Sequence, residues 1–392
     1  MTTTINNEHK KPNVPNLRFP EFQGEWEKYE LGDICDIITD FVAAGSFASL
    51  RENVKYYQEN NYAQLIRTID LKNNFTNSDF VYVDEVAYDF LWRVQLKEPN
   101  IVLPNIGANI GEKYYVKPQD LPKNKNVLGP NAILLRSKCN DTHFVYFRLS
   151  TSSYDNEMKK LVGASGQPKF NKTDLKKVSL FMPSLIEQKR IAYFLALLEE
   201  RIATQNKIID KLQSLIKGIA QKIVHSNKTN VRLSECVECS SSTLQESDVC
   251  EHGAYPVYGA NGIVGYLDNY NTEGEAVYII KDGSGVGTVS YVTGKCSATG
   301  TLNTLQAKEG YSLQYLYYLL KVFNFEPYKT GMAIPHIYFK DYGKAKFFCP
   351  SYTEQLRYAR LLSAIDNKLS AEQHILTSLS LQKQYLLRQM FI

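Results

Sequence analysis

Two long stretches of the chain place an apolar residue at alternating spacings of three and four. Such spacing is typical of a coiled coil, because it keeps one face of an α-helix apolar. We therefore expect two helices of about 38 residues, roughly 57 Å long, that pack against each other antiparallel. The first polar position of each series, Gln205 or Glu372, falls near the middle of its helix, so these side chains should meet. The series are Ile191, Leu195, Leu198, Ile202, Gln205, Ile209, Leu212, Ile216, Ile219 and Ile223, then Tyr358, Leu362, Ile365, Leu369, Glu372, Leu376, Leu379, Lys383, Leu386 and Met390.

A second apolar stripe flanks each series. A two-stranded coil needs only the narrow series, so the extra stripe predicts that another surface packs there, from a partner subunit or from the rest of the chain. The alternative is a self-contained helical hairpin with ordinary exposed leucines. The stripe comprises Phe194, Leu197 and Ile208 in the first helix and Leu361, Ala364 and Ile375 in the second.

The segments that lead into the two helices are diverged copies of each other. PKFNKTDLKKVSLFMPSLIEQKRIAYFLALLEERI begins at Pro168, and PHIYFKDYGKAKFFCPSYTEQLRYARLLSAIDNKL begins at Pro335, 167 positions later. In both copies a Pro-Ser pair stands three residues before a Glu, which fits a helix capping box. Further upstream the matches continue with gaps, because the first copy carries extra residues. The chain is therefore a duplication of one module and one helix.

Both modules have the pattern of mixed α and β structure. YPVYGANGIVGYLDNY and EAVYIIKDGSGVGTVSYV alternate apolar and polar residues around glycine turns, and NIVLPNIGANIGEKYYV plays the same part in the first copy. We predict an α+β fold: two mixed α/β modules separated by two long antiparallel coiled-coil helices, with a pseudo-two-fold internal repeat. The expected bounds are 1–185 for the first module, 186–226 for the first helix, 227–352 for the second module and 353–392 for the second helix.

Composition narrows the class of protein. The 392 residues are 44% hydrophobic and 22% charged, which is typical of folded globular chains. No apolar run is long enough to span a membrane, and the polar start has no secretory signal. Seven cysteines, an odd number, predict reduced thiols in a cytoplasm. The net charge of +4 says little, but lysines cluster at 113–138 and 159–177. These clusters suit phosphate binding or an ordinary solvated surface.

No pattern of catalytic or metal-binding residues stands out. Gly283, Gly285 and Gly287 are spaced by two, so they match neither a dinucleotide fingerprint nor a phosphate loop. Cys236 and Cys239 form a lone Cys-x-x-Cys pair, better explained as small buried side chains than as a zinc site. The chain lacks the Asn-Pro-Pro-aromatic motif of adenine methyltransferases and a Pro-Asp…Glu-x-Lys nuclease cluster. We therefore expect no catalytic residue, no metal site and no cofactor on this chain.

The whole chain resembles the specificity subunit of type I restriction-modification systems. The resemblance rests on PNLRFPEFQGEWEKYELGDI, YPVYGANGIVGYLDNY and the twin P-S-x-x-E-Q-x-R helix starts, together with the module-helix order. It implies that each module is a target recognition domain that reads one half of a split, asymmetric site in double-stranded DNA. The helices would set the unread spacer and bind two methyltransferase subunits through Phe194, Leu197, Ile208, Leu361 and Ile375. S-adenosylmethionine would belong to those subunits, and ATP and magnesium to motor-nuclease restriction subunits.

Reading DNA requires base-edge donors and acceptors on loops, with cations for phosphates. By chemistry and repeat position the candidates are Asn109, Lys113, Gln167 and Lys169 in the first module and Asn261, Lys281, Ser284 and His336 in the second. A duplicated scaffold that binds protein or glycan through some of its 27 tyrosines remains open, as does a self-sufficient methyltransferase, although the missing motif disfavours the latter.

Overall fold

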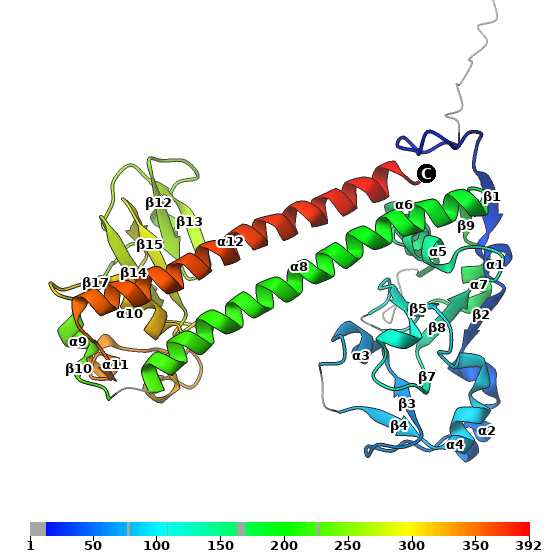
Figure 1. The fold of residues 1–392 in the computed structure, drawn as a ribbon, viewed down its shortest axis with the longest axis horizontal. Helices are drawn as coiled ribbons and strands as arrows, with labels where there is room; N and C mark the ends of the chain where they lie inside the picture. The colour runs from blue at the N-terminus through cyan, green and yellow to red at the C-terminus, as the bar shows by residue number, and fades with distance from the viewer. Residues whose placement is uncertain (1–12, 77–78, 108, 163–168, 226–227) are drawn as a thin grey trace, which may run out of the picture. The chain divides into compact units, whose positions relative to one another are not determined.

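The computed structural model describes residues 13–76, 79–107, 109–162, 169–225 and 228–392 and divides the chain into two compact units (Figure 1). Unit 1 comprises Met1–Ile202 with Ser378–Ile392, and unit 2 comprises Ala203–Thr377. Each unit contains one α/β module and part of each long helix. The described residues up to 184 are called the first module below, and residues 228–351 the second module.

A four-stranded antiparallel sheet of order β2-β8-β5-β6 forms the centre of the first module. Both faces of its inner strands are buried. Because successive side chains of a strand point to opposite faces, neighbouring residues enter two different cores. Ile101 and Leu135 pack in one core with the long helices, whereas Val102 and Leu134 pack in a second core with the sheet β4-β3-β7. The strands are β2 (Ile37–Asp40), β3 (Ala63–Ile66), β4 (Val81–Val83), β5 (Asn100–Pro104), β6 (Tyr114–Val116), β7 (Asn126–Leu128) and β8 (Ala132–Arg136).

Helices cover and connect these strands. α5 (Thr142–Leu149) begins where the carboxylate of Asp141 accepts the backbone N–H of Phe144, and Phe144 and Phe147 then enter the first core. The other helices of the module are α1 (Leu31–Ile34), η1 (Phe41–Ala44), α2 (Phe47–Asn53), α3 (Thr68–Lys72), α4 (Glu85–Phe90), η2 (Trp92–Val94), η3 (Pro118–Asp120), α6 (Ser152–Val162) and α7 (Lys172–Lys176).

The second module repeats this plan around a sheet of order β11-β17-β14-β15. Val277 and Ile279 of β14 pack with the helices, whereas Ala276 and Tyr278 face a smaller core with the sheet β13-β12-β16. Its strands are β11 (Val237–Ser241), β12 (Tyr255–Gly259), β13 (Gly262–Leu267), β14 (Glu275–Ile280), β15 (Val289–Thr293), β16 (Ser297–Ala298) and β17 (Leu302–Ala307). Its helices are α9 (Leu233–Cys236), η4 (Glu246–Asp248), α10 (Leu313–Leu320), η5 (Glu326–Tyr328) and α11 (Phe339–Tyr342).

Equivalent contacts tie each module to the start of a long helix. β1 (Glu27–Glu30) pairs antiparallel with β9 (Ser179–Met182), as β10 (Val231–Arg232) pairs with β18 (Lys346–Phe347). The Gln188 carboxamide accepts the N–H of Asp141 and donates to the Pro183 carbonyl. Gln355 makes the same two contacts, with Ser312 and Pro350. The duplication read from the sequence is therefore also a duplication of contacts.

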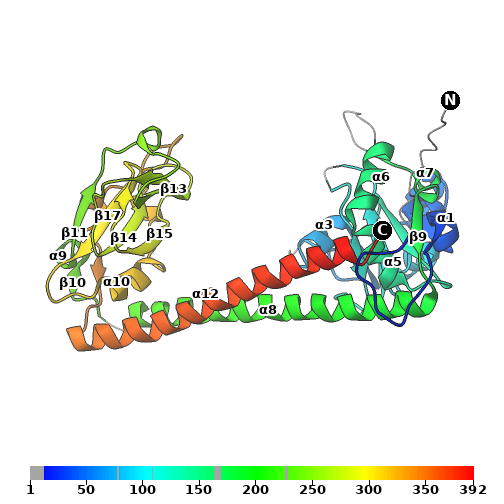
Figure 2. The same ribbon diagram turned by 90° about the horizontal axis from the view of Figure 1, so that it is seen from above.

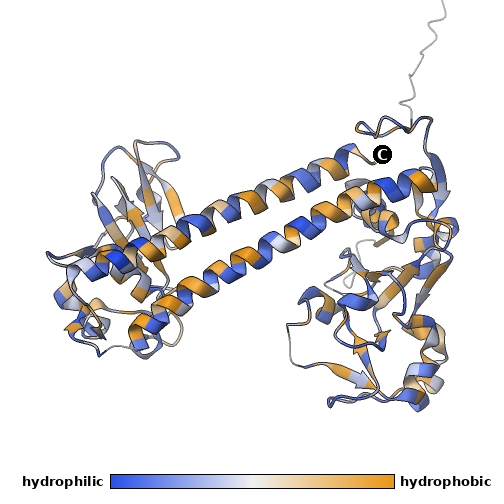
Figure 3. Cartoon of the chain, viewed as in Figure 1, coloured by the Kyte–Doolittle hydropathy of each residue, from blue (hydrophilic) through white to orange (hydrophobic). Residues whose placement is uncertain are grey.

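The two long helices are α8 (Leu185–His225) and α12 (Tyr352–Gln389), each beginning one residue before its expected start. Every residue of the two apolar series is buried or half-buried, and apolar residues recur along both helices (Figure 3). In unit 2, the Gln205 carboxamide donates to the backbone carbonyl of Glu372 at 3.0 Å and to its carboxylate. Hydrogen bonds from Lys368 and Gln205 lower the pKa of Glu372.

In unit 1, the start of α8 lies beside the end of α12, as both views show (Figures 1 and 2). Leu195 shares a buried core with Leu386 and Met390, and Lys383 donates to Glu199 at 2.6 Å. The helices are thus antiparallel within each unit. The predicted fold class, two mixed modules and two long antiparallel helices with an internal repeat, is confirmed.

Two further observations concern the remaining sequence patterns. Cys236 faces Cys349 across 3.9 Å between their sulfurs, and this contact and burial raise the pKa of Cys236. Cys236 is thus a buried side chain of the core, as expected, whereas Cys239 is only half-buried. Among the described residues no group of His, Cys, Asp and Glu is arranged to hold a metal ion. None of the described helices is both long and apolar enough to cross a membrane.

Candidate nucleic-acid interface

In the first module, the loop after β5 meets the segment that precedes α7. Ile106 forms a bridge with Lys169, and the N–H of Phe170 donates to the carbonyl of Asn105 at 3.2 Å. Lys169 is exposed at this junction. This contact between the β5 loop and the segment before α7, called the junction below, thus places Lys169, a predicted phosphate-binding residue, beside the β5 loop. Gln167, the neighbouring candidate, lies outside the described residues.

The other two candidates of this module are engaged in internal contacts. Asn109 Oδ1 accepts from the Lys72 ammonium at 2.9 Å, and Lys72 also binds Glu112 at 2.7 Å. Lys113 forms an ion pair with Asp155, and its side chain is only 13% exposed. A contact from Lys113 to DNA would first have to break that pair, so the geometry favours a structural role for Lys113.

The second module has the same junction. Asp282 forms a bridge with His336, and the N–H of Ile337 donates to the carbonyl of Lys281 at 2.9 Å. The carboxylate of Asp282 also contacts His336 Nδ1 at 2.5 Å. Ser284 is exposed in the adjoining glycine turn, where Gly283 and Gly287 have the positive φ angles that favour glycine. The structure therefore brings Lys281, Ser284 and His336 together.

Asn261 lies at the exposed tip of the β12–β13 hairpin. The chain reverses through Ala260 and Asn261, and Gly262 then has a φ of 99°. Among the described residues, no hydrogen bond joins Asn261 to Ser284 or His336. Ala260, the residue before Asn261, packs against the core that contains Ile280, the residue before Lys281, so the hairpin adjoins the strand that leads to the other candidates.

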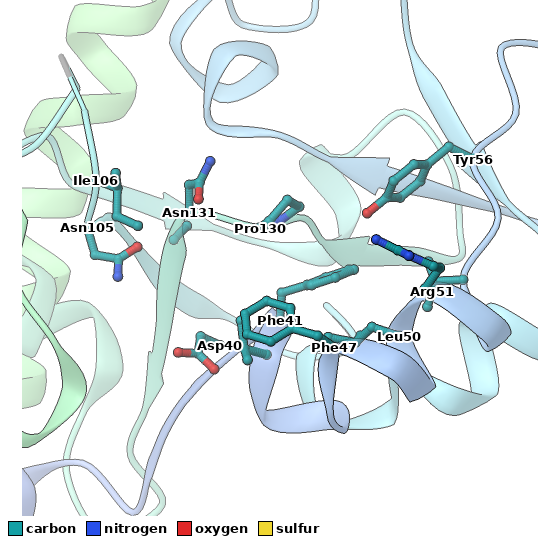
Figure 4. A pocket seen from close by; sticks show the side chains of 13 residues that line it. Asp40, Phe41, Phe47, Leu50, Arg51, Tyr56, Asn105, Ile106, Pro130 and Asn131 are labelled. Atoms are coloured by element: carbon teal, nitrogen blue, oxygen red, sulfur yellow. The ribbon is translucent and has the colours of Figure 1, made fainter.

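A hollow in the first module was missed by sequence reasoning. Its volume is about 500 Å³, and Figure 4 shows Arg51 and Tyr56 at one end, Asn105 and Ile106 at the other, and aromatic rings between them. It lies between η1 and α2 on one side and the turn after β7 on the other. The lining residues are Asp40, Phe41, Val42, Phe47, Leu50, Arg51, Val54, Tyr56, Asn105, Ile106, Pro130, Asn131 and Ala132.

A second hollow adjoins the other side of η1 and carries more charge. Trp92 is 63% exposed there, with the Arg93 guanidinium 5.0 Å from its ring centre. Lys172 lines this hollow and donates to Asp40 of the first one at 2.8 Å. The remaining cations of its lining are Lys97, Arg136 and Lys176, and its anions are Asp36 and Glu98. Basic side chains therefore gather next to the aromatic hollow.

The stripe that flanks the apolar series is open on both helices. In unit 1, Leu197 is 47% exposed, and Phe194 is partly covered by the ring of Phe19 at 5.8 Å. In unit 2, Leu361 is 51% exposed, and Ile208 and Ile375 are also exposed. Side chains of this size are usually buried, so these two surfaces suit contact with another protein.

The segment before β1 was also missed as a structural element. Glu187, in the first turn of α8, is 1% exposed and accepts from Arg18 Nε and Nη2, both at 2.8 Å. Trp26 Nε1 donates to the same carboxylate at 3.4 Å, and its ring packs against Phe144 and Phe391. The hydrogen bond to Glu187 raises the pKa of Arg18. The segment around Arg18 and Trp26 thereby anchors the start of α8.

Comparisons with known proteins agree with this architecture. The chain is 27% identical over 223 residues to a putative type I restriction enzyme specificity subunit, MjaX, of Methanocaldococcus jannaschii. The matched region covers 55% of this chain and 49% of that protein. It is 28% identical over 112 residues to the EcoprrI specificity subunit of Escherichia coli, covering 29% and 28% of the two chains. The matches thus span half or less of these relatives' length.

The fold resembles that of a solved protein over nearly its whole length. The crystal structure of a type I restriction-modification S subunit from M. genitalium has a TM-score of 0.66 and 18% identity, and the match covers 97% of this chain and 99% of that one. The family model of the type I restriction modification DNA specificity domain matches twice, at residues 23–214 and 225–381. These matches correspond to the two module-helix copies, and the chain belongs to the type I restriction-modification DNA specificity domain family.

Proposed function

We propose that this chain reads a bipartite, asymmetric sequence in double-stranded DNA and catalyses nothing itself. Each module would read one half of the target, and the long helices would set the unread spacer between them. The observation that carries this proposal is the repeated junction, at which Lys169 in one module and His336 in the other occupy equivalent places. Two readers on one scaffold but with different exposed side chains suit a target whose halves differ.

The chemistry of the junctions fits nucleic acid. Lys169 and the basic hollow beside η1 offer cations for phosphates, and the loops at Asn105 and Ser284 offer polar groups for base edges. Methyl transfer and cleavage would be carried out by partners, two methyltransferase subunits and the restriction subunits. S-adenosylmethionine would then bind to the former, and ATP and magnesium to the latter. Such an assembly would work in the cytoplasm.

Salt dependence of DNA binding tests this function in the full chain. We expect log K to fall steeply with log salt, with a slope of about −5 if roughly six phosphates are neutralised. Lys169→Ala should reduce the slope by about one, whereas Lys28→Ala, an exposed lysine on β1, should leave it unchanged. A slope near zero would favour the alternative of a protein-binding or glycan-binding scaffold. Methyl transfer by the purified chain alone would overturn the non-catalytic role.

Partner docking gives a separate prediction. Leu197→Asp combined with Ile208→Asp should weaken binding of the methyltransferase subunit by about 100-fold or more, since each change places a charge in an apolar contact. Co-purification measures this loss, and the circular dichroism of the isolated chain should not change. Ala203→Asp is the matched control, because Ala203 is exposed on a different face of α8. Retained co-purification of the double variant would place the docking surface elsewhere.

A further inference from the structure

The hollow beside α2 combines apolar walls with unused polar groups. Phe47 is 80% exposed and Tyr56 is 53% exposed, although both are large side chains at the edge of a recess (Figure 4). Arg51 lies one helical turn after Phe47 and is exposed, and its guanidinium forms no ion pair within the described part of the chain. An exposed aromatic ring and a guanidinium without an ion pair, one helical turn apart, suit a ligand that has both apolar surface and hydrogen-bond acceptors.

The far end of the hollow carries amides. Asn105 donates through Nδ2 to the Phe170 carbonyl at 3.3 Å, but its Oδ1 is shielded from solvent and has no hydrogen-bond partner among the described residues. Buried acceptors are normally satisfied, so this one needs an explanation. Asn131 also lines the hollow and has a φ of 66°, which is unusual for a residue other than glycine. Asn131 is exposed, so its amide can donate to and accept from the edge of a nucleobase.

The position of the hollow in the repeat is informative. Its aromatic wall comes from residues 41–56, within the part of the first copy that has no gap-free counterpart in the second. The helix starts and the junction contacts are shared by both copies, but this wall is not. Two readers of different sequences must differ where they touch bases. The hollow is also continuous with the candidate junction, because Ile106 both lines it and bridges to Lys169.

We infer that the hollow formed by α2, η1 and Asn131 is the base-reading centre of the first module, with Arg51 donating to a guanine. This inference rests on the proposed function and specifies one site for it. A guanidinium matches the O6 and N7 acceptors that guanine presents in the major groove, and Phe47 supplies an apolar contact beside it. The cations of the adjoining hollow, Arg93 and Lys176, serve the neighbouring phosphates.

The test uses the full chain and the DNA sequence that mapping of methylated adenines identifies as its target. The half of this sequence that stays the same when the second module is exchanged is the half-site of the first module. Arg51→Ala should reduce discrimination against a changed guanine in that half by about 10-fold to 100-fold and leave discrimination in the other half unchanged. Replacing that guanine by 7-deazaguanine removes N7 but keeps base pairing. The replacement should weaken binding of the unaltered chain and have little further effect on the Arg51→Ala chain.

Controls separate this inference from the proposed function. Phe47→Ala should also weaken binding to the first half, whereas Val86→Ala, a similarly exposed side chain on α4, and Lys28→Ala should not. If the unaltered chain shows no sequence preference on DNA, the proposed function itself fails. If the preference exists but survives Arg51→Ala and Phe47→Ala intact, or if the first half-site contains no guanine, only the base-reading site is wrong.

Discussion

Exchange of residues 227–352 for the same region of a relative is expected to change one half of the methylated DNA sequence completely and to leave the other half intact. The exchanged region contains the second module and ends where α12 begins. Mapping methylated adenines in the genome of a host that carries the exchanged chain, with its methyltransferase partner, measures both halves at once.

The physical reason is that each module has its own core. Val277 and Tyr278 on the two faces of β14 pack only within unit 2, as Ile101 and Val102 on β5 pack within unit 1. The exchanged module would meet the retained α12 through Gln355, which among the described residues hydrogen-bonds only to backbone atoms of the module, the N–H of Ser312 and the carbonyl of Pro350. A simultaneous change in both half-sites would show that the readers are coupled and would refute the modular model.

Lengthening the helices is the complementary change. Four residues inserted after Gln205 and four after Glu372 add about 6 Å to each helix and rotate the downstream part of the chain by about 40°. Both half-sites should then persist, while the unread spacer grows. DNA twist can absorb part of the rotation, so some methylation should remain. The same mapping of methylated adenines measures the spacer, and loss of either half-site would contradict the view of the helices as a spacer.

The sequence predicted the long helices and the duplication well, because the helices follow from the spacing of nearby residues and the duplication from the direct match of two segments. Alternating spacings place Gln205 and Glu372 in the same series as buried leucines, and the structure brings them together. The order of strands in the sheets could not be predicted from the sequence, because β8 pairs with β2 and β5, which lie far from it in the chain. Nor could the pattern show that β5 is buried on both faces, because that depends on the sheet β4-β3-β7 lying against it.

The candidate site was predicted only where the repeat helped. Lys169 and His336 were chosen by their position in the repeated segment, and the structure puts them at equivalent bridges. Lys113 was chosen by the same criteria, but nothing in the local sequence indicates that Asp155 binds it. The hollow lined by Phe47 and Arg51 was missed because it is assembled from three separate segments without a repeated counterpart.

Glu187 and Glu354, in the first turns of the two long helices, should differ greatly in their contribution to stability, although the sequence makes them equivalent. Glu187→Ala is expected to lower the free energy of unfolding of unit 1 by about 3 kcal/mol, because it leaves the Arg18 guanidinium and Trp26 Nε1 without their shared acceptor in a nearly solvent-free site. For a unit of this size the loss corresponds to a fall of roughly 6–12 °C in Tm. Trp26 and Trp92, both in unit 1, are the only tryptophans, so their fluorescence follows this unit.

Glu354→Ala supplies the matched control from the second copy. Glu354 is exposed and accepts only from the Ser351 hydroxyl, at 2.9 Å, among the described side chains. Its removal should cost about 0.5 kcal/mol, typical of an exposed site. The difference arises because the segment around Arg18 and Trp26 covers the first helix start, whereas the second has no such cover over Glu354. Equal losses from the two changes would mean that the contacts of Arg18 and Trp26 with Glu187 do not stabilise unit 1.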